Sequence, residues 1–353
     1  MLVYLINIVL ILVWGFLLIY SNPTRKKKKI FCIIASLQWI LISGLRGLSV
    51  GDDTWAYGYA FARAGNMSWR EIWREFIGLY FQKSETKTKD AGYLIFQKLI
   101  YSFTANYRIY LIIVAIIIFA TLGGFIYKNA KDACFSYILF SCLFYSFYAI
   151  TGIRQALATA LIVFIGTEFI KKRKFVPFLI ISLIAYTLHK SALVFVPFYF
   201  LGNKKITKTY LITLFACTIV LLALGPSNLL RMAAWFGYEH EEAFILRPTV
   251  YIALMLLMGT GTLVLLPTLK EKPDYNNVET NGILLAVVLT VLTILNQGMM
   301  RVQQYYALYM MFAIPSMINC FNKKSGWSVK MVCVAILILL LARNNPQYVF
   351  YWQ

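Results

Sequence analysis

Residues 2–20 read LVYLINIVLILVWGFLLIY, an apolar stretch without a charged side chain. A helix needs about 20 such residues to cross the hydrocarbon core of a bilayer. No cationic region precedes the stretch and no small-residue cleavage site follows it, so we expect a retained membrane span and not a signal peptide. Apolar runs of similar length recur along the whole chain, and together they decide the fold class.

These runs predict an all-α fold: a polytopic integral membrane protein with about 12 transmembrane or re-entrant helices. We expect a single transmembrane domain over residues 1–353, with long extracytoplasmic loops at 46–106 and 226–247. The predicted spans are 2–20, 30–45, 107–127, 133–150, 155–170, 175–189, 191–202, 209–225, 248–266, 282–298, 303–321 and 328–342.

The composition excludes an ordinary soluble domain. Hydrophobic residues make up 60% of the 353 residues, charged residues only 14%, and the mean hydropathy is +0.70. A formal charge of +20 could suggest nucleic acid, but the basic residues lie in short loops between apolar runs, where they set membrane topology. We therefore expect no nucleic-acid partner. The six cysteines lie inside apolar runs at spacings unlike a metal site, so we expect small core residues and no metal.

Lysine and arginine divide between the two sides of the membrane. The short loops on one side hold 17 lysines and 2 arginines, which makes that side cytoplasmic and places both termini outside. The other side holds 5 lysines and 10 arginines. Topology needs only positive charge, whereas arginine offers a planar fork for phosphate or carboxylate. The outer face is therefore equipped to hold an anion; the alternative is that some of these arginines only anchor to lipid headgroups.

The loop at 46–106 contains a predicted amphipathic helix in the outer membrane interface. Ser68 and Glu71 form a capping box at its start. Its apolar face, at helical spacing, consists of Trp69, Ile72, Trp73, Phe76 and Tyr80. Residues 92–103 are too short to span and are expected to dip into the membrane and return. The short apolar runs on either side of His189 predict broken helices that line a cavity.

Four groups of polar residues on the outer face could carry chemistry. The first is GLRGLSVGDDT at 44–54. Glycines around Arg46 let backbone N–H groups approach an anion, and Asp52 or Asp53 could act as a general base or hold a divalent metal. The alternative is a glycine-rich turn whose acidic residues cap the next helix.

The second group is TGIRQ at 151–155, at the outer start of a span. A cation at a helix N-terminus interacts unfavourably with the helix macrodipole. We therefore expect that a bound anion or a facing carboxylate stabilises the charge of Arg154. Snorkelling to lipid headgroups is the alternative.

The third group is HKS at 189–191, at the outer boundary of a broken helix. His189 could act as a base or contact a diphosphate, although a lone histidine there can also be a hydrogen-bonded structural residue. The other histidine, His240, lies in the acidic stretch EHEE and is expected to be solvated.

The fourth group is Arg301 with Tyr305, four residues apart and therefore on one helix face. An arginine above a tyrosine suits a phosphate or sugar ligand, and an aromatic interface belt gives the same pattern.

In their order and spacing these segments resemble the EpsG family, which is grouped with the Wzy-type bacterial polysaccharide polymerases. The resemblance covers nearly the whole chain. It includes the stretch Asp90-Ala91-Gly92-Tyr93, where the acid is usually Glu in this pattern. Because the chain departs from the pattern at this position, we assign Asp90 no role.

The resemblance implies a glycosyltransferase of the bacterial plasma (inner) membrane that joins oligosaccharide repeat units carried on undecaprenyl diphosphate, as in O-antigen, capsule or exopolysaccharide synthesis. The growing chain is the donor, its lipid diphosphate leaves, and a sugar hydroxyl on the next unit is the acceptor. No cofactor is implied, and the sequence has no P-loop or Rossmann fingerprint. The expected partners are the lipid-linked oligosaccharide, membrane lipids, a chain-length regulator and a flippase.

Mapped onto this chain, the resemblance gives a set of predicted site residues. Arg154 and Arg301 would hold the diphosphate and stabilise the charge that develops on it, while Arg46 supports the loop or a phosphate. The predicted substrate-binding residues are Arg46, Tyr57, Arg154, Gln155, Arg301 and Tyr305, and the candidate bases are Asp52, Asp53 and His189.

Three alternatives stay open at this point: an O-antigen-ligase-like glycosyltransferase, a flippase for the same lipid-linked sugar, and an acyltransferase that uses one histidine. A flippase predicts inverted repeats and charges at mid-membrane, whereas these charges cluster at one face. An acyltransferase leaves the outer arginines unexplained.

Overall fold

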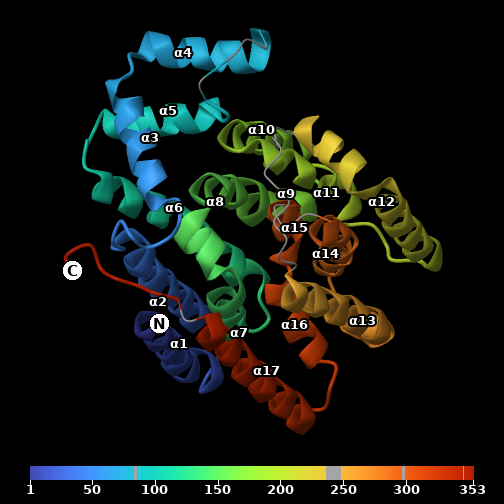
Figure 1. Cartoon of the computed structure of the whole chain (residues 1–353). Helices are drawn as coiled ribbons and strands as arrows, with labels where there is room; N and C mark the ends of the chain where they lie inside the picture. The colour runs from blue at the N-terminus through green and yellow to red at the C-terminus, as the bar shows by residue number, and fades with distance from the viewer. Residues whose placement is uncertain (83–85, 87, 236–247, 296–298, 345) are drawn as a thin grey trace. The chain divides into compact units, whose positions relative to one another are not determined.

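The computed structural model describes residues 1–82, 86, 88–235, 248–295, 299–344 and 346–353. Within these ranges the chain is all-helical, as predicted, and its one extended pairing is an isolated antiparallel bridge between Arg46 and Phe350. Figure 1 shows the helices in chain order. They are α1 (Leu2–Gly15), α2 (Arg25–Gly44), α3 (Thr54–Asn66), α4 (Trp69–Ile77), α5 (Ala91–Tyr101), α6 (Tyr107–Asn129), α7 (Ala133–Leu139), α8 (Ile153–Thr159), α9 (Gly166–Lys171), α10 (Phe175–Leu188), α11 (Phe198–Leu201), α12 (Lys208–Trp235), α13 (Thr249–Glu271), α14 (Asn277–Leu295), α15 (Met300–Ala307), α16 (Met310–Ile318) and α17 (Lys323–Asn344).

Wider or tighter helical turns extend several of these helices. The wide π-helical turns are η1 (Phe16–Tyr20), η2 (Gly78–Gln82), η3 (Phe140–Phe144), η4 (Ser146–Thr151) and η5 (Ala160–Ile165), and η6 (Lys190–Phe195) is a 3-10 helix. Such turns lengthen α7 and α8 into the predicted spans 133–150 and 155–170.

Seven helical segments in the described ranges are long and apolar enough to cross a membrane. They are Leu2–Tyr20, Tyr107–Asn129, Ile153–Lys171, Lys208–Gly225, Thr249–Glu271, Asn277–Ile294 and Lys323–Asn344. Shorter apolar helices cover Ala133–Phe144, Phe175–Leu188 and Lys190–Leu201. The all-helical fold with several candidate membrane spans is therefore confirmed, but the predicted number of about 12 spans is not.

Two predicted spans, 30–45 and 303–321, are found neither among the seven candidate spans nor among the shorter apolar helices. Helix α2 begins with the cations Arg25–Lys29, so that only Ile30–Gly44 is apolar. The predicted span 303–321 is interrupted at Leu308–Tyr309, between α15 and α16. Most of the predicted loop 226–247, including His240 and Arg247, lies outside the described residues. Its first part continues α12 past a kink at Gly225 (φ 70°, ψ 170°).

The chain divides into two compact units. The first unit comprises Met1–Ile165, Ile180–Lys190 and Cys333–Gln353, and the second comprises Gly166–Leu179 and Ser191–Val332.

The core of the first unit forms where α2 packs along α6. Trp39 of α2 stacks on Phe119 of α6 with a centroid separation of 5.8 Å, and its indole N–H donates to the Ser141 hydroxyl at 3.1 Å. The Ser36 hydroxyl donates to the Phe119 carbonyl at 2.9 Å. Small polar residues such as serine let membrane helices approach closely and join them by hydrogen bonds.

The first unit has two chemically distinct ends. At one end, which we call the lysine end, the Lys28 ammonium donates to the Ala130 carbonyl at 2.5 Å and the Tyr20 hydroxyl donates to the Asp132 carboxylate at 2.9 Å. At the other, the arginine end, Tyr4 packs against Tyr348 and the Arg46 guanidinium reaches the Ala149 carbonyl at 3.4 Å. Helices α1, α2 and α6 each run between these ends, so the ends are the opposite faces of the helical layer.

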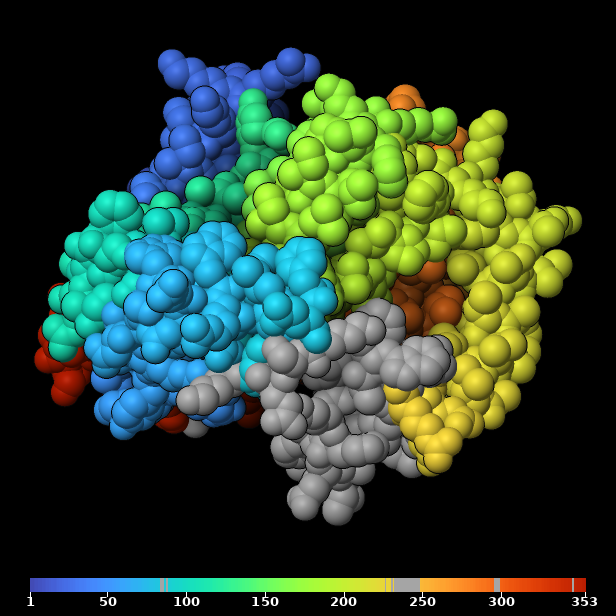
Figure 2. Space-filling view, turned by 90° about the horizontal axis from the view of Figure 1, so that it is seen from above, coloured from blue at the N-terminus to red at the C-terminus, as the bar shows by residue number. Residues whose placement is uncertain are grey.

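The predicted loop 46–106 folds into the helices α3, α4 and α5. Helix α4 has the predicted capping box, in which Ser68 and Glu71 satisfy each other's backbone N–H groups. Ile72 is buried in a cluster with Ala64 and Leu94, whereas Trp69 and Trp73 are about half exposed. Figure 2 shows this segment, in light blue, at the surface. Helix α3 was expected only in the alternative interpretation of the first group, as the helix that follows the glycine-rich turn.

The second unit is built on α12, α13 and α14. A cluster of buried apolar residues joins Tyr210, Leu266 and Leu284. The Asn281 amide donates to three carbonyls, those of Leu201, Gly202 and Lys204, at 2.8–2.9 Å, and so fixes the turn after α11. Apolar side chains on the outer surfaces of α12 and α13 are exposed, as expected for helices that face lipid.

Candidate functional site

The most densely connected polar group of the first unit surrounds Asp90, which is 4% exposed. The Arg154 guanidinium donates to Asp90 Oδ2 at 2.7 Å, and His189 Nδ1 lies 3.3 Å from the same oxygen. The backbone N–H of Lys190 donates to Asp90 Oδ1 at 3.2 Å. We call Asp90, Arg154 and His189 the Asp90 cluster.

Three chain segments meet in this cluster. Asp90 is the residue before α5, but its side chain does not cap that helix and points to the other segments instead. Arg154 lies in the first turn of α8, and His189 directly follows α10, where its backbone N–H donates to the Ala185 carbonyl at 2.9 Å. Because α8 begins where η4 ends, at the arginine end, the cluster lies at that end of the unit.

Gly92 allows α5 to reach α10. A Cβ atom at position 92 would overlap with the Thr187 side chain and would lie 2.7 Å from the Thr187 carbonyl carbon. The backbone carbon cannot move away as a flexible side chain could. A glycine is therefore needed two residues after Asp90 if the carboxylate is to meet His189.

The electrostatics of the cluster keep Asp90 ionised. Burial alone would raise the pKa of Asp90, but the hydrogen bond and charge of His189, the charge of Arg154 and the Lys190 N–H outweigh burial and hold the pKa below its usual value. An ionised carboxylate can only accept hydrogen bonds, so His189 Nδ1 must carry the proton that faces it. When the ring is neutral, the other ring nitrogen, Nε2, is an acceptor.

Arg154 is held on one side and open on the other. Its Nη1 is bound to Asp90, while 35% of its side chain is exposed. The buried Tyr57 side chain interacts with this guanidinium. Burial raises the pKa of Tyr57, and the charge and hydrogen bond of Arg154 act against that rise. A guanidinium has five N–H donors, so Arg154 can hold Asp90 and still bind a second anion.

Several tyrosine side chains pack around the segments that form the cluster. The Tyr93 and Tyr110 hydroxyls share a hydrogen bond of 2.7 Å, and the Tyr57 and Tyr93 rings meet edge to face at 6.0 Å. The Tyr80 hydroxyl donates to the Thr187 carbonyl at 3.2 Å, which ties η2 to the end of α10.

The predicted bases Asp52 and Asp53 lie apart from these contacts. Asp52 is exposed and Asp53 is the half-buried residue before α3, and neither carboxylate forms a hydrogen bond or ion pair with a residue that the structure describes. The glycine-rich stretch forms a turn: Gly51 has a φ of 88°, and the Thr54 hydroxyl donates to the Val50 carbonyl at 2.6 Å. The turn matches the alternative interpretation of the first group, but the Asp53 side chain forms no capping hydrogen bond with α3.

Arg46 is buried at the arginine end. Its Nη1 donates to the Ser43 carbonyl, and it lies 3.2 Å from the Ser43 hydroxyl and 3.4 Å from the Ala149 carbonyl. Gln155 is also buried, directly after Arg154.

Arg301 and Tyr305 belong to the second unit. Arg301 is exposed in the first turn of α15, whereas Tyr305 is fully buried and shares a hydrogen bond of 2.9 Å with the Ser191 hydroxyl. Tyr305 is thus engaged with η6 and is not open to a ligand in this arrangement.

Sequence reasoning missed Asp90, the central residue of the cluster. The available signal was the stretch Asp90-Ala91-Gly92-Tyr93, which was recognised but set aside because of the Asp in place of Glu. Both residues carry a carboxylate, and the shorter side chain only requires α5 to come closer to its partners. Gly92 provides that approach.

Comparisons with known proteins identify the family of the chain. No curated protein and no solved structure matches it. The sequence model of the EpsG family matches residues 29–350, nearly the whole chain, and includes every residue of the Asp90 cluster. The chain therefore belongs to the EpsG family.

Proposed function

We propose that this membrane protein is a polysaccharide polymerase: a glycosyltransferase that joins undecaprenyl-diphosphate-linked oligosaccharide repeat units on the extracytoplasmic face of the bacterial plasma membrane. Membership of the EpsG family suggests polysaccharide biosynthesis. The observation that carries the reaction is the Asp90 cluster, in which one buried carboxylate holds a cation and an imidazole side by side.

The proposed reaction needs both a base and a cation. The acceptor hydroxyl oxygen forms a bond to the anomeric carbon of the donor sugar, and the bond from that carbon to the diphosphate oxygen breaks. The hydroxyl proton must be removed, and the leaving diphosphate gains the bonding electron pair. His189 Nε2 takes the proton, and the open side of Arg154 stabilises the charge that develops on the diphosphate.

Asp90 acts through its two partners. It keeps the proton of His189 on Nδ1, and it stabilises the imidazolium that forms when Nε2 takes a proton, as the buried aspartate does in serine-protease triads. Because its pKa lies below the usual value, Asp90 itself is a poor proton acceptor at neutral pH. The proposed base is therefore His189 in place of Asp52 or Asp53.

The two ends of the first unit support an extracytoplasmic site. The lysine end gathers Lys28 with the neighbouring cations of residues 25–29. The positive-inside rule assigns such an end to the cytoplasm. The Asp90 cluster lies at the opposite end, together with Arg46 and Tyr348, so the same rule supports a location on the outer side of the membrane for it.

The test is the variant His189→Asn, because the Asn amide can still donate to Asp90 but cannot act as a base. The purified His189→Asn variant in lipid nanodiscs should extend a lipid-linked repeat unit about 10²–10⁴-fold more slowly than the wild-type protein. His240→Asn, which changes the other histidine of the chain, is the matched control and should be unaffected. Equal rates for His189→Asn and the wild type would reject His189 as the base. Transport of the lipid-linked unit across a vesicle membrane without a new glycosidic bond would favour a flippase.

A further inference from the structure

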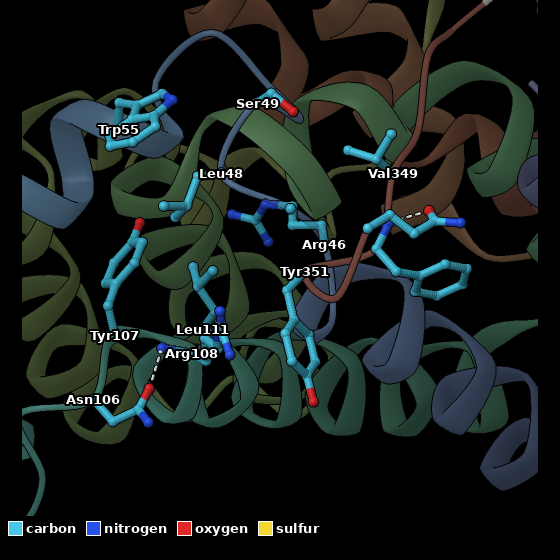
Figure 3. A pocket seen from close by; sticks show the side chains of 13 residues that line it. Arg46, Leu48, Ser49, Trp55, Asn106, Tyr107, Arg108, Leu111, Val349 and Tyr351 are labelled. Carbon is cyan, nitrogen blue, oxygen red and sulfur yellow. Dashed lines mark hydrogen bonds between the residues drawn. The ribbon is translucent and has the colours of Figure 1, made fainter.

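A cavity opens at the arginine end of the first unit. Its volume is about 420 Å³, within the range of small-ligand sites. Figure 3 shows that it lies between the turn after α2, the starts of α3 and α6, and the C-terminal residues. Arg46 and Arg108 line it, and the described lining residues include no Asp or Glu. The side chains of the cavity's walls therefore do not balance this positive charge.

Arg46 is the most informative residue of this cavity. It is only 3% exposed, and its Nη1 is engaged with Ser43 and Ala149. Its Nε and Nη2 atoms, which donate from one shared edge of the planar group, have no hydrogen-bond partner among the described residues. A buried cation with an unsatisfied edge is costly unless a ligand completes it. That edge matches the two oxygens of a phosphate or carboxylate.

The groups around Arg46 cannot serve as its counter-charge. The titratable side chains that face it are those of Tyr4, Tyr107, Tyr110 and Tyr348. Tyrosine hydroxyls are neutral at physiological pH, since their ordinary pKa is about 10. An anion from outside the chain is therefore the group that would balance Arg46.

The other walls suit a sugar ring. The Arg108 guanidinium lies 4.3 Å from the centre of the Tyr351 ring, which holds the second cation at the rim. Trp55 and Tyr107 add aromatic faces on the opposite wall, and aromatic rings of this kind pack against the C–H face of a sugar.

Two amides in the wall can reach sugar hydroxyls. The Asn106 side-chain oxygen accepts from the Arg108 backbone N–H at 2.9 Å, which leaves its NH₂ group as a donor. The Gln353 side-chain oxygen likewise accepts from the Phe350 N–H at 2.9 Å and leaves its NH₂ group as a donor. Cations, aromatic faces and amide donors together describe a site for a charged carbohydrate.

We propose that this cavity is a second carbohydrate subsite, which binds a sugar ring that carries a phosphate or carboxylate group, with the oxyanion on the Nε–Nη2 edge of Arg46. The assignment of that ring to the polymerase substrate rests on the proposed function. Its oxyanion has two possible sources: the phosphate of the lipid carrier or an acidic sugar within the repeat unit.

The cavity is connected to the Asp90 cluster through η4. The Ser43 hydroxyl and Arg46 both donate to the Ala149 carbonyl of η4. Helix η4 ends at Thr151, three residues before Arg154. A glycan bound both in the cavity and at Arg154 would therefore lie along the end of η4.

Binding to the full-length protein in detergent, measured by calorimetry, tests the subsite. The probes are N-acetylglucosamine 1-phosphate, glucuronic acid, neutral N-acetylglucosamine and inorganic phosphate. We expect at least one charged sugar to bind at least 10-fold more tightly than both the neutral sugar and phosphate. The phosphosugar or glucuronic acid that binds identifies the source of the oxyanion. If neither charged sugar binds, or if the neutral sugar or phosphate binds equally well, the proposal is overturned.

Two variants and one control separate the subsite from general effects. Arg46→Lys keeps the charge but loses the planar fork, and Arg108→Gln changes an exposed side chain at the rim of the cavity. Each variant should lower the affinity for the charged sugar by about 10- to 100-fold. Arg63→Gln, an exposed arginine of α3 outside the cavity, should leave binding unchanged. Unchanged binding in both cavity variants overturns the proposal, and Arg108→Gln decides alone if Arg46→Lys does not fold.

A failure of the proposed subsite can be distinguished from a failure of the proposed polymerase function. Protein that extends no lipid-linked unit but binds a charged sugar through Arg46 and Arg108 would contradict the polymerase and leave the subsite standing. Protein that extends chains normally while both variants bind the probes like the wild type would contradict the subsite alone.

Discussion

Asp90 shows how one side chain can organise groups that are far apart in the sequence. Its carboxylate accepts from Arg154 and the Lys190 N–H and lies within hydrogen-bond distance of His189, residues 64 to 100 positions away. Each of these groups would be placed differently without it, since Arg154 could turn to solvent and His189 could change tautomer. A substitution at Asp90 should therefore alter stability and activity together.

The variant Asp90→Asn should lower the free energy of unfolding by about 1–3 kcal/mol at pH 7, because it removes the buried charge to which Arg154 and the Lys190 N–H donate. The sign of the pH dependence follows from the depressed pKa of Asp90. The stabilisation is complete above the ordinary value of 3.8 and is lost as pH falls through the lower folded-state pKa. The difference in thermal midpoint between wild type and variant should be level between pH 5 and about 4 and shrink below that. A difference that grows on acidification would contradict the assigned charge.

Arg154→Lys tests the role of the guanidinium in leaving-group binding. A lysine keeps the charge but cannot hold Asp90 and a diphosphate through one planar fork, so polymer formation should fall by about 10²–10³-fold. Arg301→Lys carries the same prediction for the second unit. Arg63→Lys is the exposed control, and membrane levels of all three proteins should be compared by immunoblot. Wild-type polymer length from Arg154→Lys would mean that this residue only anchors to headgroups.

At the scale of the elements, the approach of α5 to α10 is the contact that builds the cluster. The variant Gly92→Ala should separate these elements, because its methyl group would overlap with Thr187. We expect a loss of about 1–3 kcal/mol in stability and most of the polymerase activity. Gly124→Ala is a matched control in α6, where a Cβ meets no atom within 4 Å. Activity and thermal midpoint of both purified variants provide the measurement, and equal behaviour of the two would reject this account of Gly92.

Local signals in the sequence predicted local structure well. The apolar runs gave the membrane helices, and the spacing of Ser68 and Glu71 gave the start of α4. Asp90 could not be found this way, because its partners are defined only after α5, α8 and α10 have packed. His189 and Arg154 were predicted from their unusual positions near helix ends. Their shared carboxylate has no comparable local pattern, since an acid before a helix usually reads as a cap.

At the scale of the whole molecule, the separation of lysine and arginine predicts orientation. A protein in which all six native cysteines are replaced provides the background for single-cysteine labelling with an impermeant thiol reagent. In intact cells Arg63→Cys should be labelled from outside, whereas Lys172→Cys should react only after the membrane is opened. Both side chains are exposed, so that the reagent can reach either of them once it is on the correct side. Labelling of residue 172 in intact cells would reverse the orientation and the proposed location of the site.

The C-terminal wall of the Arg46 cavity has a consequence for the time at which the cavity can form. The Tyr348 hydroxyl donates to the Ile42 carbonyl, 306 residues earlier in the chain, and the Val349 carbonyl accepts from the Gly47 N–H. A ribosome adds about 5–20 residues per second, so residue 47 waits about 15–60 s for its partner. During that interval the turn around Arg46 has no wall to close it. Nascent chains, however well inserted their first helices are, therefore cannot hold a ligand there, and the subsite becomes available only when translation has passed residue 351.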